Sequence, residues 1–350
     1  MSLSFLSNSW LIAIFVLAAM VIWFAGIKLT VALDTMSKHF KFGEAMGGMI
    51  FLAIVTNLPE IAITGIAAYS HHMEIAISNI LGGIAIQTVV IVVIDVFGVG
   101  KKSPLSFKAS SIGLILEGVI LIFILGLVIL GKQFSPNFVL LGASPVEWMI
   151  PLVWIIGIIL IYRNPTVEHV SVVKMKQLKE FKKSQTIEEK KITKKKATKA
   201  MLVFVICALL TLVAGLFLEV TSEEIAGRFG ISSVIFGATI LALVTSLPEI
   251  STGIESAKLE DYQMAVSDIL GGNAFLPVLL LLGSLISGSS IIHLVGSVDI
   301  YLTALSILLT GTYMIGLIIK SQKQLGYIGY DSLAVLVLYI FGIAGLFYVH

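Results

Sequence analysis

Two nearly identical heptapeptides constrain this chain more than any other feature. They read VTNLPEI at residues 55–61 and VTSLPEI at residues 244–250, and both place a proline and a glutamate inside a strongly apolar segment. The match is longer than the heptapeptide, because seven of nine residues are identical between 52–60 and 241–249. One unit of structure is therefore expected to occur twice, with the second copy 189 positions after the first.

A second match at the same offset supports this repeat. The segment AISNILGG at 76–83 aligns with AVSDILGG at 265–272, again 189 positions later and without a net gap. A chance match of this quality, twice at one offset, is very improbable. We therefore expect the two halves of the chain to share a fold.

The composition indicates what surrounds that fold. The chain is 57% hydrophobic and only 13% charged, with a mean hydropathy of +1.03, whereas soluble proteins carry roughly 25% charged residues. Apolar runs such as 10–28 and 201–218 reach the length of roughly 17–25 residues that spans a bilayer as a helix. The alternation typical of membrane β-barrels is absent. The first span lacks the basic start and cleavage site of a signal peptide, and the single Cys207 excludes an intrachain disulfide.

The sequence thus predicts an all-α polytopic membrane protein with ten transmembrane helices. We divide it into a first five-helix repeat at 1–162, a basic loop at 163–199 and a second five-helix repeat at 200–350. The expected spans lie near 8–33, 43–69, 74–98, 109–131, 144–162, 200–220, 231–257, 262–287, 291–319 and 329–349.

The basic loop predicts the orientation. Residues 163–199 hold 12 of the 23 Lys and Arg residues, and such positive bias places a loop in the cytoplasm. Both termini should then be outside a cell membrane (inner or plasma membrane). Because five is odd, the two repeats cross in opposite directions, which is the inverted-repeat architecture of many secondary transporters. The loop itself is interpreted as a solvated linker, with a regulatory role or contact with anionic lipid as the alternative.

The prolines predict broken helices at mid-membrane depth. Proline has no N–H, so Pro59 cannot donate a hydrogen bond to the carbonyl of Val55. Pro248 likewise cannot donate one to the carbonyl of Val244. Thr56, Asn57, Thr245 and Ser246 are candidate caps for a new half-helix that starts at each proline. The next residues, Glu60 and Glu249, would lie in its first turn, where the helix dipole favours a carboxylate. A packing kink with a capping glutamate would need no ion, yet a carboxylate in mid-membrane costs about 2.5–3.5 kcal/mol.

The oxygen-rich chemistry of these motifs predicts a site for a hard cation. Carboxylates, hydroxyls, amides and freed carbonyls suit Ca²⁺, which takes about 6–8 oxygens, whereas zinc and copper prefer His or Cys. One Ca²⁺, two Na⁺ or two H⁺ would each neutralise two carboxylates. If only the neutralised site changes sides, exchange follows.

These motifs resemble those of the calcium/cation antiporter superfamily, and especially its sodium/calcium exchanger branch. FGISSVIFGATILALVTSLPEI at 229–250 is similar to the second repeat signature of that family, and FGEAMGGMIFLAIVTNLPEI at 42–61 resembles the first. The resemblance covers essentially the whole chain. It implies that the first and sixth spans slide across the core to alternate access.

The resemblance also implies the ligands of the cation. Glu60 and Glu249 would be central, and further oxygens would come from the neighbouring side chains and from two backbone carbonyls. These further candidates are Thr56, Thr245, Asn57 and Ser246, and the carbonyls of Ala53 and Ala242.

The third and eighth spans depart from the exchanger pattern. Gly83 stands where the pattern has Ser, and Gln87 where it has a late Asn. In the second copy the equivalent residues are Gly272 and Leu276, so oxygen ligands are missing. Asp268 adds an acid where the pattern has Asn, a position that Asn79 retains in the first copy. Fewer cation sites and weaker Na⁺ coupling are the expected consequences.

Asn79 and Asp268 could instead cap helices, and the sequence does not decide between the roles of helix cap and cation ligand. Asp95 and Glu117 are acids within spans, interpreted as structural, with proton transfer or pairing with Lys28 as alternatives. The adjacent residues 71 and 72 are histidines, interpreted as a surface pair rather than a metal site.

We therefore expect a secondary active antiporter that moves Ca²⁺ in exchange for Na⁺ or H⁺, with the lipid bilayer and inorganic cations as its only expected partners. The alternatives are a proton-coupled exchanger of Mn²⁺, Mg²⁺, Na⁺ or K⁺ and, less favoured, a cation channel. No enzyme activity is expected, because no nucleophile or HExxH set accompanies the glutamates. No cofactor and no nucleic-acid partner are expected. The oligomeric state is open, and a monomer would suffice.

Overall fold

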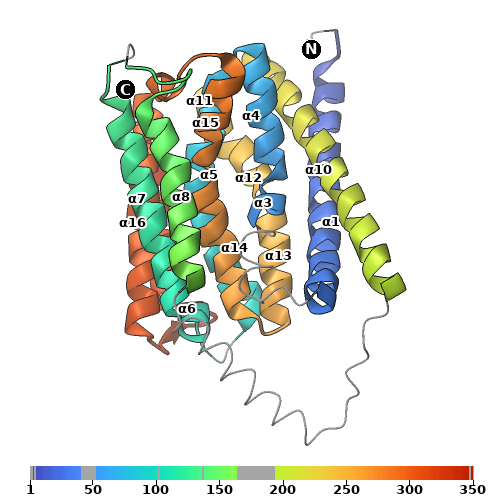
Figure 1. The fold of residues 1–350 in the computed structure, drawn as a ribbon, viewed down its shortest axis with the longest axis vertical. Coiled ribbons are helices and arrows are strands. Elements are labelled where there is room, and N and C mark those ends of the chain that lie inside the picture. The colour runs from blue at the N-terminus through green and yellow to red at the C-terminus, as the bar shows by residue number, and fades with distance from the viewer. Residues whose placement is uncertain are drawn as a thin grey trace, which may run out of the picture.

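A computed structural model describes residues 3, 5–40, 53–100, 103–135, 138–163, 194–346 and 348–349 of the chain. Helices dominate these residues (Figure 1). In the first half they are α1 (Asn8–Phe40), α3 (Ala53–Thr56), α4 (Leu58–Ser70), α5 (Met73–Ile94), the π-helical turn η2 (Asp95–Val99), α6 (Leu105–Ala109), α7 (Ile112–Lys132) and α8 (Pro145–Arg163).

The second half begins with α10 (Lys194–Phe229). It continues with α11 (Ser233–Phe236), the π-helical turn η3 (Gly237–Leu241), α12 (Ala242–Thr245), α13 (Leu247–Lys258), α14 (Tyr262–Phe275), α15 (Val278–Ser287), the 3₁₀ turn η4 (Ile292–Leu294), α16 (Ser297–Ile319) and α17 (Tyr330–Leu346). Before α17, strands β1 (Gln324–Leu325) and β2 (Ile328–Gly329) form an antiparallel hairpin in which Gln324 pairs with Gly329.

Seven segments of the described residues are long and apolar enough to cross a membrane, and two shorter apolar helices, 145–161 and 330–346, accompany them. The seven are Asn8–Leu29, Met73–Val99, Ile112–Lys132, Lys196–Phe229, Ser233–Lys258, Tyr262–Ser287 and Ser297–Ile319. The predicted second span is only partly described, because residues 41–52 lie outside the described ranges. Most of the basic loop, 164–193, lies outside them too.

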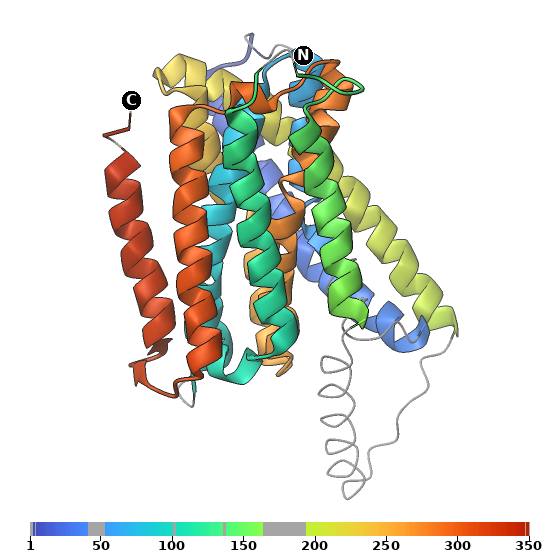
Figure 2. The same cartoon turned by 60° about the vertical axis from the view of Figure 1, so that its left-hand side comes forward.

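The helices are arranged around α5. In the most apolar stretch of the span that contains α5, 78% of the residues are buried, whereas the equivalent figures are 33% for α1 and 28% for α10. Figure 1 shows α1 and α10 side by side at one edge, and Figure 2 shows α16 and α17 at the opposite edge. Large apolar side chains such as Trp10, Phe24 and Leu202 are exposed on α1 and α10, as expected for a lipid-facing surface.

The two halves have matching helix boundaries at the offset found in the sequence. Breaks occur at Asn57, between α3 and α4, and at Ser246, between α12 and α13, with almost the same backbone angles (φ −85°, ψ 13° and φ −82°, ψ 1°). A difference between the halves lies at Pro277, which separates α14 from α15, whereas α5 is continuous through the equivalent Thr88.

Small residues allow close packing at matching points of the halves. A Cβ added to Gly26 of α1 would lie 3.1 Å from Cα of Pro248, and a Cβ added to Gly215 of α10 would lie 3.0 Å from Cα of Pro59. The ILGG segment of α5 packs in the same way, because a Cβ on Gly82 would lie 2.6 Å from Cα of Ala238. These glycines bring α1, α10 and η3 against the broken helices and α5.

Candidate functional site

The two LPE motifs place both glutamates in the first turn of a half-helix, as the sequence predicts. Glu60 lies in the first turn of α4 and Glu249 in that of α13, each just after the helix-starting proline. Their side chains are 1% and 0% exposed. None of their four carboxylate oxygens has a hydrogen-bond partner among the described residues. Such buried, unmatched acceptors are costly unless a ligand satisfies them.

Each carboxylate has a threonine hydroxyl from the other half of the chain beside it. The Thr245 hydroxyl lies beside Glu60, and the Thr56 hydroxyl lies beside Glu249. Glu249 is also close enough to Glu60 and Asp268 to interact with their charges. The acids of the two halves therefore form one electrostatic unit.

Asn79 and Asp268 are connected to this group of acids by two equivalent hydrogen bonds, each of which joins one half of the chain to the other. Thr56 Oγ1 donates to Asp268 Oδ1 at 3.4 Å, and Thr245 Oγ1 donates to Asn79 Oδ1 at 3.4 Å. Both acceptors lie within continuous helices, α14 and α5, and are 1% exposed. The alternative that they cap helices is therefore wrong.

Asn57 and Ser246 occupy the N-cap positions of α4 and α13, as the sequence predicts, but neither side chain makes a capping hydrogen bond. Asn57 Nδ2 instead donates to the Ala53 carbonyl at 2.5 Å, and Ser246 Oγ donates to the Ala242 carbonyl at 2.7 Å. The Asn57 Oδ1 atom remains buried without a partner among the described residues. In the second copy the carbonyl of Val244 is not bare either, since the Ser246 N–H points to it.

The departures in α5 and α14 change the space around the site. A Cβ on Gly272 would lie 2.9 Å from Asn57 Nδ2, so the missing side chain leaves room for the Asn57 amide. On the other side, a Cβ on Gly83 would meet only the apolar Leu276, at 3.9 Å. Gln87 is fully buried with both amide atoms unpartnered among the described residues.

Sequence reasoning missed two polar groups here. Thr252 of α13 donates a hydrogen bond to Asp268 Oδ2. Asn273 of α14 donates to Thr88 Oγ1 of α5 at 3.4 Å, and its own Oδ1 is unpartnered within the described chain. An amide inside the apolar stretch after ILGG is the sequence signal that could have drawn attention to Asn273.

Asp95 and Glu117, the other two acids that the sequence places within spans, accept hydrogen bonds from neighbouring groups. Asp95 accepts hydrogen bonds from two backbone amides, and Glu117 accepts one from Ser267 Oγ at 3.0 Å. Among the ion pairs of the described residues, neither is paired with Lys28. No group of three or more His, Cys, Asp and Glu side chains with metal-binding geometry occurs among the described residues, so a bound cation would need hydroxyl, amide and carbonyl oxygens in addition to the glutamates.

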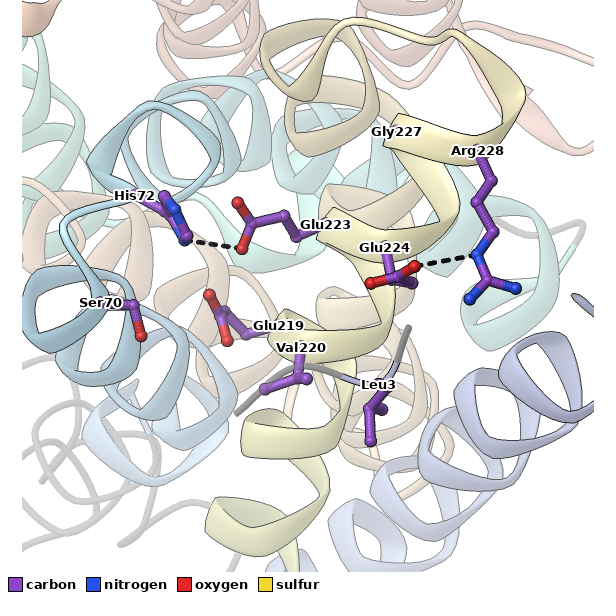
Figure 3. A pocket seen from close by; sticks show the side chains of 9 residues that line it. All are labelled: Leu3, Ser70, His72, Glu219, Val220, Glu223, Glu224, Gly227 and Arg228. Atoms are coloured by element: carbon purple, nitrogen blue, oxygen red, sulfur yellow. Dashed lines mark hydrogen bonds and ion pairs between the residues drawn. The ribbon is translucent and has the colours of Figure 1, made fainter. Parts of the chain in front are cut away.

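A cavity of about 430 Å³ lies away from these acids, between the end of α10 and the turn after α4 (Figure 3). Within it His72 Nδ1 lies 2.8 Å from Glu223 Oε2, and Arg228 Nε lies 2.9 Å from Glu224 Oε1. The buried Glu219 also faces it. His72 and the acidic side chains of Glu219, Glu223 and Glu224 thus line one cavity.

Comparison with known proteins supplies the family. The family model for sodium/calcium exchanger proteins matches residues 10–167 and 199–348. The uncharacterized membrane protein MJ0091 of Methanocaldococcus jannaschii is 24% identical over 281 residues, which cover 80% of this chain and 82% of that protein. "Putative antiporter CaxA" of Alkalimonas amylolytica is 24% identical over 281 residues, covering 75% and 76%.

A solved structure shares the fold. The sodium-calcium exchanger NCX_Mj superposes with a TM-score of 0.64 at 19% sequence identity, covering 96% of this chain and 98% of the solved chain.

Proposed function

Because the chain belongs to the sodium/calcium exchanger protein family, whose members are cation transporters, we propose that it is an antiporter that exchanges Ca²⁺ for Na⁺ or H⁺ by alternating access. The observation that carries this proposal is the set of four buried glutamate oxygens without hydrogen-bond partners among the described residues. Mg²⁺, Mn²⁺, Na⁺ or K⁺ in place of Ca²⁺ is the second candidate, since all take oxygen ligands.

The proposed cargo site combines both halves. Glu60 and Glu249 supply the charge that a divalent ion needs, and the hydroxyls beside them supply neutral oxygens. The proposed neutral ligands are Thr56, Thr245, Asn57, Ser246, Asn79 and Gln87, with the carbonyls of Ala53 and Ala242; Asp268 is a third acid at the edge of the site. The unpartnered oxygens of Asn57 and Gln87 support their inclusion.

We further propose that the ten predicted spans form two inverted five-helix repeats, with 163–199 between them. The reciprocal bonds of Thr56 and Thr245 support this arrangement, because each motif contacts the helix of the other half. The contacts of Gly26 with Pro248 and of Gly215 with Pro59 fit a transport step in which α1 and α10 slide over the broken helices.

The counter-ion can be identified by transport of ⁴⁵Ca into proteoliposomes. Because Gly83, Gly272 and Leu276 supply no side-chain oxygen, we expect fewer Na⁺ sites and hence uptake driven more strongly by an outward H⁺ gradient than by an outward Na⁺ gradient. Uptake should also fall as the external pH is lowered at constant internal pH, since external protons compete with Ca²⁺ for the carboxylates. Steep, cooperative Na⁺ drive at constant pH would contradict this, and no uptake under either gradient would exclude Ca²⁺ as cargo.

A channel with the same ligands would behave differently. Its flux would not require a cation on the opposite face, whereas an antiporter shows saturating flux that such a cation stimulates. Measuring ⁴⁵Ca uptake with and without unlabelled Ca²⁺ inside the same vesicles separates the two.

The proposed orientation has both termini outside and the loop at 163–199 in the cytoplasm, because the positive charge is concentrated there. A cysteine introduced at Lys183, in a chain whose Cys207 is replaced by serine, should resist an impermeant maleimide in whole cells and react after lysis. Labelling from outside the intact cell would show that the orientation is the reverse of the proposed one.

A further inference from the structure

Two aspartates outside the proposed cargo site, the buried Asp95 and the half-buried Asp331, meet where η2, α16, α17 and β2 come together. Asp95, the first residue of η2, accepts hydrogen bonds from the N–H groups of Leu105, at 2.7 Å, and Gly329, at 2.8 Å. Asp331 lies in the first turn of α17. A Cβ on Gly329 would lie 2.5 Å from Asp331 Oδ1 and 3.3 Å from Asp95 Oδ2, so both carboxylates border the same small space.

Glycines hold that space open for Asp331. On the opposite side of its carboxylate, a Cβ on Gly316 of α16 would lie 2.5 Å from Asp331 Oδ2. A side chain at either Gly316 or Gly329 would therefore displace the carboxylate, because Cβ atoms do not come this close to other heavy atoms. The backbone of α16 and β2 thus leaves room for the Asp331 carboxylate beside that of Asp95.

Two buried hydroxyls complete the cluster. Ser332 is 0% exposed and lies beside Asp95, and Tyr313 is 1% exposed and lies within electrostatic range of both aspartates. The Ser332 Oγ, Tyr313 Oη and Asp331 Oδ2 atoms are all buried without a hydrogen-bond partner in the described chain. Neither aspartate has an ion-pair partner there.

We propose that Asp95, Asp331, Ser332 and Tyr313 bind a small hard cation, Na⁺ or Ca²⁺, at a second site separate from the cargo site. Two neighbouring carboxylates that border one buried space repel each other unless a cation or a proton offsets one of the charges. Carboxylate and hydroxyl oxygens are ligands that such cations accept. A cation bound there connects the ends of α5, α16 and α17 and stabilises their junction.

The test uses the full-length protein with Glu60→Gln and Glu249→Gln, in which the cargo site lacks its charges. The midpoint of thermal unfolding is measured in detergent at constant ionic strength as choline is replaced by Na⁺ or, separately, by Ca²⁺. A ligand that binds only the folded state raises this midpoint. We expect at least one of the two cations to raise it, and the two titrations distinguish which.

Two substitutions and one control make the test specific. Adding Asp331→Asn should abolish the cation-dependent shift, and adding Ser332→Ala should raise the half-effective concentration about tenfold through loss of one ligand. Asp299→Asn is the matched control, because Asp299 is a buried acid of α16 whose oxygens accept bonds from Ser78 and Gly296; it should leave the shift intact.

A shift that survives both Asp331→Asn and Ser332→Ala would overturn the proposal, as would a midpoint that responds only to pH or to neither cation. The Ser332→Ala arm decides the matter even if Asp331→Asn prevents folding. Failure of the proposed transport function would show separately, as absence of ⁴⁵Ca uptake by the wild-type protein under both gradients.

Discussion

Replacing Glu60 or Glu249 with glutamine is expected to lower Ca²⁺ transport by two orders of magnitude or more at a fixed ion concentration. Glutamine keeps the shape but removes one negative charge from the site. Two unit charges 4 Å apart attract by about 4 kcal/mol at an effective dielectric of about 20, and a divalent ion doubles this. One third of that loss is about 2.7 kcal/mol, which corresponds to roughly a hundredfold change in affinity at 1.4 kcal/mol per factor of ten. Initial rates of ⁴⁵Ca uptake into proteoliposomes measure the effect.

The fold of these variants should be little harmed, because a neutral amide costs less than a carboxylate at membrane depth. Glu117→Gln is the matched control: Glu117 is also buried in a helix, and its hydrogen bond comes from Ser267, outside the proposed ligands. Its transport should be close to normal. Well-folded Glu60→Gln and Glu249→Gln proteins with wild-type rates would instead support the view that these glutamates only stabilise the kinked helices.

Replacing Gly82 with alanine should destabilise the protein strongly and impair transport. The added Cβ would lie 2.6 Å from both Cα and O of Ala238, which are backbone atoms that cannot rotate away. Overpacking of this kind typically costs about 1–3 kcal/mol. Because Ala238 belongs to η3, which leads into α12 and Glu249, the displacement would also move one half of the cargo site. Thermal unfolding and ⁴⁵Ca uptake report the two effects.

Gly126→Ala provides the comparison for that experiment. A Cβ at Gly126 of α7 meets nothing within 4 Å, and alanine favours the helix more than glycine does. Its stability should equal or slightly exceed that of the wild type. Equal behaviour of the Gly82→Ala and Gly126→Ala proteins would contradict the close packing of α5 against η3.

Local chemistry made the broken helices predictable. Pro59 and Pro248 cannot complete a helix, so the breaks and the first-turn positions of Glu60 and Glu249 follow from the sequence alone. The apolar runs likewise predict the helices that the structure describes. The repeat predicts that positions 56 and 245 are equivalent, and the structure gives both the same kind of partner.

Contacts between distant segments were not predictable in this way. The bond from Thr252 to Asp268 and the packing of Asn273 beside Thr88 depend on how helices meet, which periodicity does not encode. Asn57 takes the predicted N-cap position, but its side chain does not cap α4 because its amide donates to the Ala53 carbonyl, one turn earlier. The pairing of Asp95 with Asp331 joins residues from different halves, so the repeat gives no hint of it.

Counting the Ca²⁺ ions bound to the purified protein tests the central claim most directly, because it does not depend on a transport cycle. Equilibrium dialysis against ⁴⁵Ca would compare the wild type with the Glu60→Gln, Glu249→Gln double variant under identical conditions. If the two glutamates hold the transported ion, the double variant binds one Ca²⁺ fewer per chain. An unchanged number of bound ions at unchanged affinity would contradict the assignment of the cargo site to Glu60 and Glu249.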